Sequence, residues 1–449
     1  MSASRPHVAV IGGGLAGIAA ALECADLGAR VTLLERRGRL GGLTWSFQHG
    51  GRWVDNGQHV FLRCCDEYQW FLGRIGAAGD VQLQDRLDIP VVSPAPAPGG
   101  RPRVARLRRP AVRVPAPLHL AGSLIRYRHL GVRDRLALGL AVAPLRRLRL
   151  DDPSLDGETF AAWLARHGQS PAAVSALWDL ITVPTVNLGA SEASLAVAAK
   201  VFQTGLLGDP AAADIGWSRV PLGRLHGDNA AAALARSGVE VRLAARVERV
   251  EPSGAGFSVL GPTLSVDADA VVVAVPHDDA GGVLPPGAVP GQDRLGELGS
   301  SAVVDVHLVY DRPVMTWPLM AGVGTPLQWV FDRTASSGME PGPGRPQYLA
   351  VSFSAADHLL GRRPEELAGW VAAELPRLLP VAGEARLVDS LVTKERRATF
   401  RAVPGTARLR RGPRTSWPGL TLAGAWTDTG WPATMEGAAL PLQHTEEVA

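Results

Sequence analysis

The sequence predicts an α/β protein in which a Rossmann-type domain is interrupted by an inserted α+β domain. Three observations support this fold class. A short apolar strand near the N-terminus runs into a glycine-rich turn and an Ala-rich helix, a similar strand, turn and helix lie near the C-terminus, and a long mixed segment separates them. Strands and helices that alternate in this way are typical of a parallel sheet covered by helices. The length of 449 residues suggests two or three domains.

The N-terminal unit begins with His7–Ile11, a β-branched run typical of a buried parallel strand. The segment Gly12–Gly17 follows and fits the pattern G-x-G-x-x-G. An Ala-rich helix is expected over Ile18–Leu27 and a second strand over Arg30–Leu34. Strand, glycine pattern, helix and strand in this order give the pattern the context that a dinucleotide site requires.

Each glycine of the pattern has its own role in binding a dinucleotide. Gly12 permits the tight turn, Gly14 lets the backbone approach a pyrophosphate, and Gly17 allows the helix to pack on the strand. The helix N-terminus then faces the phosphates with free N–H groups and the positive end of its dipole. Glu35, which ends the second strand, is expected to accept hydrogen bonds from the adenosine ribose.

The residues after Glu35 continue as RRGRLGGLTWS, without the further βαβ units of a nicotinamide domain. The adjacent Gly41 and Gly42 permit close approach of the backbone to a ligand. Arg39 is the best-placed partner for an anion, and Arg36 is a further candidate that could instead be a surface charge. This stretch resembles the R-x-G-G-x-x-x-[ST] extension of the FAD-dependent amine oxidase and carotenoid desaturase superfamily, which implies that the cofactor is FAD.

The segment Leu420–Gly437 predicts a second strand, a glycine turn and a small-residue helix from about Ala433. It resembles the superfamily's A-G-[DE] turn and T-x-E-G-A helix, so the resemblance implies cofactor contacts from Gly424, Thr434 and Met435. Ala425 stands where the superfamily usually has an acid. Asp428 is the candidate to compensate for it.

We expect the FAD-binding domain to be assembled from residues 1–75, 215–285 and 395–449, and the substrate domain from residues 76–214 and 286–394. The superfamily resemblance implies that the backbone around Val247 lies beside the adenine. The elements expected in the middle of the chain are a helix that ends at Arg236, strands over 239–243, 245–250, 268–275, 303–310 and 347–353, and a helix over 364–379.

Four segments carry a narrower resemblance. They are Trp53–Phe61, Pro184–Asn187, Ala190–Ser194 and Gly430–Gly437. Together they resemble the squalene-associated FAD-dependent desaturase family, known as hydroxysqualene dehydroxylases. The resemblance covers most of the chain and is thin across residues 286–394. It implies that hydroxysqualene is reduced to squalene in bacterial hopanoid or carotenoid-precursor synthesis.

The implied substrate is an allylic alcohol, so that loss of water leaves a delocalised cation that hydride from reduced flavin can quench. The protein must then supply an acid, a dry pocket for a C30 chain and support for the cation. Asp55 and His59 are the candidates for the acid or its relay, and the alternative is that they only bind loops near the flavin. Aromatic side chains that either line the substrate tunnel or belong to the core are Trp53, Trp178, Phe202, Trp426 and Trp431.

Three other functions stay open. A carotenoid (phytoene-type) desaturase would use the flavin in the opposite direction, to oxidise a polyene chain. A flavin amine oxidase should show an aromatic cage and a lysine-held water, whereas Lys200 and Lys394 are the only lysines in the sequence. A non-catalytic prenyl-lipid-binding protein of the same fold typically has eroded flavin motifs, and the motifs here are largely intact.

The positive charge is concentrated in residues 101–149, which carry thirteen arginines and one acid. The segment has a formal charge of +12 and leaves −9 on the rest of a chain whose net charge is +3. Short apolar runs over 118–124 and 136–145 lie among these arginines. Arginines mixed with apolar runs suit an anionic membrane surface, and a solvated face is the alternative.

These features also define the expected setting. Nucleic acid is not expected as a partner, because no recognition fold appears, and the three cysteines predict neither a disulfide framework nor a metal site. No uninterrupted apolar run reaches the length of about 18 residues that spans a bilayer. We therefore expect a cytoplasmic, peripherally membrane-associated enzyme that takes a long-chain isoprenoid, with upstream squalene-pathway synthases as candidate partners.

Overall fold

The structure, a computed structural model, describes residues 5–97 and 100–440. Its centre is a five-stranded parallel sheet with the order β10-β2-β1-β14-β20. The strands are β1 (His7–Ile11), β2 (Arg30–Leu34), β10 (Glu240–Arg242), β14 (Ala270–Val273) and β20 (Leu420–Leu422). The N-terminal, middle and C-terminal parts of the chain thus share one sheet, which confirms the predicted Rossmann-type domain.

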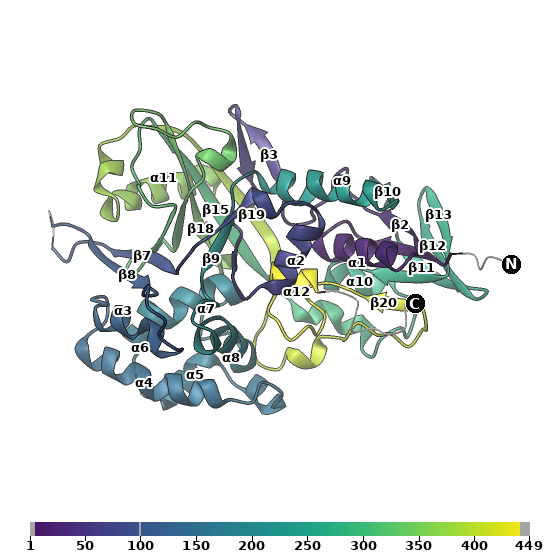
Figure 1. Cartoon of the computed structure of the whole chain (residues 1–449), viewed down its shortest axis with the longest axis horizontal. Helices are drawn as coiled ribbons and strands as arrows, with labels where there is room; N and C mark the ends of the chain where they lie inside the picture. The colour runs from purple at the N-terminus through teal and green to yellow at the C-terminus, as the bar shows by residue number, and fades with distance from the viewer. Residues whose placement is uncertain (1–4, 98–99, 441–449) are drawn as a thin grey trace.

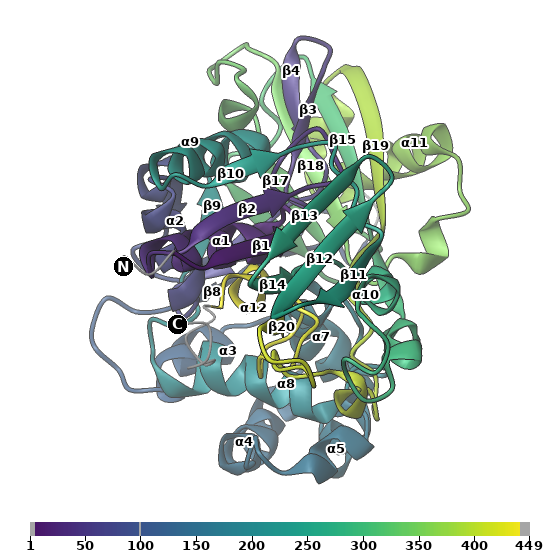
Figure 2. The ribbon, with the colours of Figure 1, turned by 90° about the vertical axis from the view of Figure 1, so that its right-hand side faces the viewer.

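Both faces of this sheet are covered, as its continuous apolar strands require. One face packs against α1 (Leu15–Asp26), α9 (Asn229–Arg236) and α12 (Met435–Ala439), and α12 also contacts α2 (Asp66–Arg74). The other face packs against α10 (His277–Val283) and an antiparallel sheet of β11 (Arg249–Ser253), β12 (Gly256–Gly261) and β13 (Leu264–Ala268). Figure 2 shows this antiparallel sheet lying across the parallel strands.

The strand predicted over residues 245–250 is wrong for its first four residues. Ala244 adopts the left-handed region with φ 53°, and the N–H groups of Ala244 and Ala245 donate to the carbonyls of Arg37 and Glu35. The chain therefore turns along the end of β2 and joins β11 only at Arg249. Val247 lies in this irregular segment and is half-buried.

A mixed seven-stranded sheet forms the second domain, and both predicted inserts contribute to it. Its order is β19-β15-β18-β17-β16-β7-β8, and only the β16–β7 pair is parallel. Its strands are β7 (Asp88–Ser93), β8 (Arg103–Arg108), β15 (Ser300–Tyr310), β16 (Leu319–Gly322), β17 (Trp329–Asp332), β18 (Gln347–Phe353) and β19 (Leu387–Phe400). Helix α11 (Pro364–Glu374) packs on one face, against Val304, Val306 and Leu308 of β15 (Figure 1). Because side chains alternate along a strand, Asp305 and His307 point to the opposite face.

Helices form a third group beside this sheet (Figure 1). They are α3 (Ala121–Ile125), α4 (Val132–Arg147), α5 (Phe160–Arg166), α6 (Pro171–Ala173), α7 (Asp179–Val186) and α8 (Leu195–Phe202). Asn187, which ends α7 in the left-handed region, fastens the group to the sheet. Its amide nitrogen donates to Ser301 O and Thr399 Oγ1, both at 3.0 Å, and its oxygen accepts from the Ala355 N–H.

Two small sheets complete the described chain. One is the hairpin of β3 (Ser46–His49) and β4 (Arg52–Asp55), and the other has the order β5-β9-β6, from β5 (Val60–Leu62), β9 (Ile215–Ser218) and β6 (Val81–Leu83). The hairpin contacts the mixed sheet through the ion pair of Arg52 with Asp389 of β19 at 2.6 Å. Among the helices of the described residues, none is long and apolar enough to cross a membrane.

Candidate active site

Two glycines of the G-x-G-x-x-G pattern, Gly12 and Gly17, are required by the fold, and the third, Gly14, leaves open space for a ligand. A Cβ atom on Gly12 (φ 111°) would lie 2.5 Å from Ala274 O, and one on Gly17 would lie 1.8 Å from Gly12 O. At Gly14, the nearest atom to such a Cβ is Gly42 Cα, 3.8 Å away. Gly14 also caps the N-terminus of α1 without a side-chain hydrogen bond. The unpaired N–H groups of the first turn therefore border an open position, as an anion site requires.

The second glycine pair lies directly against this turn. Gly41 and Gly42 have φ of 95° and 57°, and the Gly41 N–H donates to Gly13 O at 2.9 Å. Arg39 is half-buried beside them, where its guanidinium donates to Gly42 O at 3.0 Å and lies 4.3 Å from the Trp45 ring centre. Burial lowers the pKa of Arg39 to about 10, so the side chain stays positively charged at neutral pH. This loop brings a fixed cation to the glycine cradle.

Two other predicted cofactor residues meet protein partners. Arg36 forms a surface ion pair with Asp279 at 2.9 Å, which favours its alternative role as a surface charge. Glu35 is buried, and its two carboxylate oxygens accept from the Gly13 N–H at 2.6 Å and the Arg37 N–H at 2.7 Å. The acid is thereby fixed beside the fingerprint turn. Its bond to the ribose stays a prediction, as does the contact between the adenine and the backbone near Val247.

The C-terminal motif is fastened to the N-terminal unit. Gly424 (φ 139°) turns the chain after β20, and Thr434 caps α12 by accepting from the Gly437 N–H at 3.2 Å. Met435 packs among the apolar side chains of the α1 layer. Asp428 is exposed on the intervening loop, so its proposed compensation for Ala425 stays a prediction.

Glu436, whose role the sequence did not reveal, ties this motif to α2. Its two oxygens accept from the N–H groups of Glu67 at 3.3 Å and Tyr68 at 2.9 Å, which are orphan donors of the first turn of that helix. Burial raises the pKa of Glu436 to about 7. Helices α2 and α12, which lie side by side in Figure 1, are thus joined by a buried carboxyl group.

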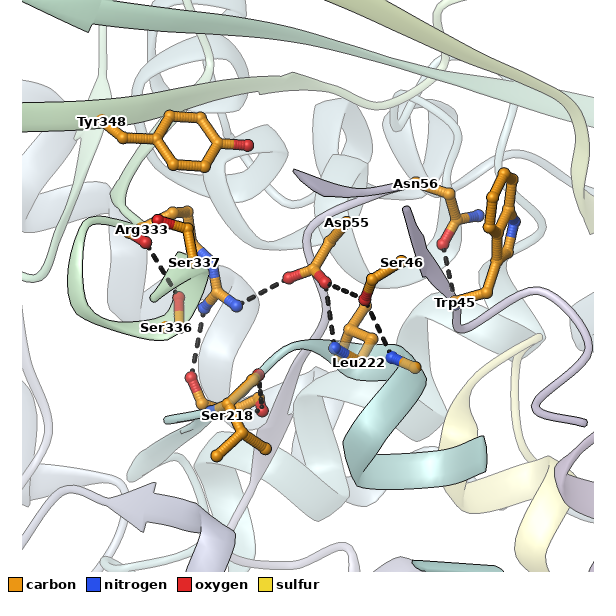
Figure 3. Close-up of polar contacts among 12 residues, drawn as sticks. Trp45, Ser46, Asp55, Asn56, Ser218, Leu222, Arg333, Ser336, Ser337 and Tyr348 are labelled. Atoms are coloured by element: carbon orange, nitrogen blue, oxygen red, sulfur yellow. Dashed lines mark hydrogen bonds and ion pairs between the residues drawn. The ribbon is translucent and has the colours of Figure 1, made fainter. Parts of the chain in front are cut away.

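Asp55, one of the two predicted acid candidates, is held in a buried ion pair. Its Oδ2 accepts from Arg333 Nη2 at 2.7 Å, and its Oδ1 accepts from Ser46 Oγ at 2.6 Å and the Leu222 N–H at 2.9 Å (Figure 3). Both charged side chains are less than a tenth exposed. Asp55 thus accepts hydrogen bonds from a guanidinium and two further donors. This arrangement favours a role in holding the surrounding loops in place over a role as a proton donor.

Arg333 follows β17 in the second insert and was not predicted from the sequence. Its Nη1 also donates to Ser218 O at 3.2 Å, so one guanidinium links β4, β9 and the mixed sheet. The Asp332-Arg333-Thr334 stretch has no motif, and 278 residues separate Arg333 from Asp55. Only the tertiary structure brings the two charges together.

His59, the other candidate, lies on the loop between β4 and β5, among buried titratable groups. Burial lowers its pKa to about 4, while Asp55 opposes this shift, so the ring is neutral at neutral pH. Burial is the main cause that lowers the pKa of His226, and the nearby His59 lowers it further. The Nε2 atom of His226 lies 2.7 Å from the Tyr68 hydroxyl. His226 Cβ lies 3.8 Å from a Cβ built on Gly41, so His226 lies beside the second glycine pair.

The predicted tunnel aromatics occupy different environments. Trp178 and Phe202 are both 3% exposed, and their ring centres lie 5.1 Å apart inside the helical group. Of the two alternatives, tunnel lining and core, this position fits the core. Trp53 is 40% exposed on β4. Trp426 is buried and donates from Nε1 to Val275 O at 2.9 Å. Trp431 contacts Lys200, whose Nζ lies 4.8 Å from the ring centre.

Comparison with known proteins identifies the family. Residues 15–440 match the family of flavin containing amine oxidoreductases. The chain belongs to this family. Hydroxysqualene dehydroxylase of Rhodopseudomonas palustris is 30% identical to it over 96% of this chain and 95% of the relative. That of Sinorhizobium fredii is 28% identical over the same shares. The 15-cis-phytoene desaturase of Narcissus pseudonarcissus is 26% identical over 98% of this chain and 79% of the relative.

Solved structures of the family have the same fold. A putrescine oxidase mutant covers 98% of both chains with a TM-score of 0.72 and 20% identity. Cyclohexylamine oxidase from Brevibacterium oxydans covers 97% of this chain and 96% of its own with a TM-score of 0.68 and 19% identity. These likenesses agree with a Rossmann-type domain that carries a substrate domain.

The protein is an FAD-dependent oxidoreductase, and its residues fit this cofactor. The open position at Gly14, the N–H groups at the start of α1 and the cationic Arg39 suit a pyrophosphate. The fixed carboxylate of Glu35 suits a ribose. Within the described residues, no group of three or more His, Cys, Asp or Glu side chains could hold a metal ion.

Proposed function

We propose that this oxidoreductase reduces hydroxysqualene to squalene. The observation that carries the proposal is the likeness, along nearly the whole length of both chains, to relatives named hydroxysqualene dehydroxylase. When bound and reduced, FAD supplies the hydride that replaces the departing hydroxyl group. The protein must bind the isoprenoid chain, exclude water and supply a proton to the hydroxyl as it leaves.

Phytoene-type desaturation is the second candidate, and the likeness to 15-cis-phytoene desaturases favours it. The two reactions use opposite states of the cofactor, so one experiment separates them. Photoreduced enzyme is incubated with hydroxysqualene and oxidised enzyme with phytoene or squalene, both without oxygen, and the lipids are analysed by mass spectrometry. Squalene from the first mixture supports dehydroxylation. Additional double bonds from the second, with hydroxysqualene unchanged in the first, would support desaturation instead.

The arginine-rich segment supports a second part of the proposal, that the enzyme takes its substrate from an anionic membrane. Helix α4 buries Leu138 and Ala141, whereas Val132, Leu136 and Leu140 are 63%, 78% and 61% exposed. These three lie four residues apart and form an apolar stripe on one face of the helix. Figures 1 and 2 both show α4 at the outer edge of the molecule. An apolar stripe flanked by arginines suits a helix that lies in a lipid headgroup layer.

The arginines of this segment divide into two sets. The first set forms ion pairs within the protein. Arg106 and Arg108 pair with Asp88, and Arg109 pairs with the fully buried Asp214 at 2.7 Å. Within the described residues, six exposed arginines have side chains without a hydrogen bond or ion pair: Arg101, Arg103, Arg113, Arg128, Arg133 and Arg147. The second set supplies the charge that an anionic surface would attract.

We predict that combined Arg128→Gln, Arg133→Gln and Arg147→Gln substitutions weaken binding to anionic vesicles on the order of a hundredfold. Each arginine near such a surface contributes about 1 kcal/mol. Leu136→Ser with Leu140→Ser should also weaken binding, including at high salt. Co-sedimentation with phosphatidylserine vesicles measures both effects. Leu27→Ser, at a 67% exposed leucine just after α1, is the matched control. Unchanged sedimentation of both multiple variants would contradict membrane docking.

A further inference from the structure

Asp305 is a buried carboxyl group that the proposed function has not yet used. It lies in the middle of β15 and is 0% exposed, and in the described part of the chain its oxygens have only weak hydrogen-bonding neighbours, the Ser352 side chain and the Gln58 backbone. A buried polar group with only weak partners is costly, so an ionised carboxylate is disfavoured here. Gln58 Nε2, on the loop that covers this face of β15, is buried without a partner among the described residues.

The geometry brings Asp305 and His59 to the same point of the active-site loop. A Cβ atom built on Gly57 would lie 3.7 Å from Asp305 Oδ2 and 3.6 Å from His59 Nε2. The two side chains therefore approach Gly57 closely, and the absence of a side chain at this position leaves the space between them open. His59 is also near enough to His226 to affect its pKa, and His226 Cβ lies 3.8 Å from a Cβ built on Gly41 of the second glycine pair.

Charged and titratable groups from every neighbouring element surround this pair. They are Arg52 and Asp55 on β4, Arg333 after β17, Tyr348 on β18, and His307 on β15 itself. On β19, Thr393 pairs with Asp305 and Glu395 lies two residues further along. Desolvation raises the pKa of Asp305 to about 7, the charge of Asp55 raises it further, and weaker interactions with Ser352 and the Gln58 backbone oppose the rise. Asp305 is thus substantially protonated at neutral pH.

We propose that Asp305 holds the proton for the reaction and passes it on through His59. This inference rests on the proposed function. The hydroxyl takes a proton from His59 as the C–O bond breaks, His59 takes one from Asp305 and stays neutral, and water departs. Asp305 is left as a carboxylate, which recovers a proton from solvent before the next turnover. The hydride comes from the reduced cofactor. Asp305 is in this account a positioning residue for the proton, because it acts through His59.

The test combines a substrate-free measurement with a pH profile, made on the FAD-loaded enzyme. Infrared spectroscopy should detect protonated carboxyl absorption that titrates near pH 7, to which Asp305 and Glu436 both contribute, and the Asp305 part should disappear in Asp305→Asn. The squalene-forming rate of the wild type should fall as the pH rises through this range. Asp305→Asn should lower the rate at pH 6 by about tenfold to a thousandfold and remove the alkaline decline. Asp305→Glu should restore part of both.

Asp311→Asn, just beyond the end of β15, is the matched control and should change neither measurement. An unchanged infrared band in Asp305→Asn would overturn the proposal, and so would a wild-type pH profile in that variant. Failure of the proposed function looks different, because the wild type would then form no squalene at any pH. Equal FAD content in wild type and Asp305→Asn shows that the substitution has left the fold intact.

Stability gives a further readout that needs no substrate. The pKa of Asp305 is raised in the folded state, so ionisation costs nothing below the unfolded pKa of about 4 and destabilises the fold increasingly up to about pH 7. Asp305→Asn should therefore raise the melting temperature relative to wild type at pH 8, and this gain should vanish below pH 4. A gain that is the same at both pH values would contradict a protonated Asp305.

Discussion

Gly14→Val is expected to purify folded and without flavin. Among the described residues, the nearest atom to a Cβ at this position is 3.8 Å away, and the backbone of Gly14 has φ −78°, which any residue adopts. The added side chain would instead occupy the space in front of the N–H groups of α1. We expect the ratio of flavin absorbance (roughly 450 nm) to protein absorbance to fall by about tenfold or more, because the backbone can no longer approach the pyrophosphate.

Two neighbouring glycines provide controls for this prediction. Gly38→Ala lies in the same region with no atom within 4 Å of the new Cβ, and should keep its flavin. Gly17→Ala brings its Cβ within 1.8 Å of Gly12 O, so the backbone must move and both flavin and melting temperature should fall. If Gly14→Val retained wild-type flavin content, the assignment of the cradle would be wrong.

Arg333→Ala is expected to destabilise the fold by about 3–5 kcal/mol, because it leaves the Asp55 carboxylate buried without its counter-charge. The free energy of unfolding from denaturant titration measures this effect. Asp55→Asn combined with Arg333→Met should recover much of the loss, since no uncompensated charge is then buried. A loss below about 1 kcal/mol for Arg333→Ala would show that the pair behaves as an exposed salt bridge.

The single variant Asp55→Asn separates positioning from acid catalysis at Asp55. Arg333 does not lie in the predicted motif, but it holds Asp55 at the junction of β4 with the mixed sheet. If Asp55 acts by positioning, Asp55→Asn in the presence of Arg333 should retain part of the squalene-forming rate, with its pH profile unchanged. Loss of the alkaline decline of the profile in Asp55→Asn would instead assign Asp55 the proton transfer.

The parallel sheet could be predicted because its signals are local. β1 and β2 have the predicted bounds, since each is a short, mostly apolar run that a glycine turn or an acid ends. Helix α1 begins at Leu15, three residues before its predicted start, because the second glycine is already its N-cap. The irregular path near Val247 was missed, since the hydrogen bonds that hold it come from residues more than two hundred positions away.

The candidate site was predictable only where a motif lies in one stretch of sequence. The structure brings Gly14 and Gly42 against each other, and Gly12, Gly41 and Gly42 adopt the positive φ angles that their turns require. Arg333 and Asp305 carry no such pattern, and the burial that gives them their significance arises when the inserted sheet packs on the β4–β5 loop. For Trp178 and Phe202 the sequence left tunnel lining and core as alternatives, and the structure places both side chains in the core of the helical group.

A single-turnover reaction tests the proposed function most directly. Photoreduced enzyme is mixed without oxygen with one equivalent of hydroxysqualene, and flavin absorbance and lipid products are followed in the same sample. We predict that the oxidised flavin spectrum returns as squalene forms, in equal amounts. A flavin that stays reduced while hydroxysqualene remains unchanged, in enzyme that carries its full complement of FAD, would contradict the proposal.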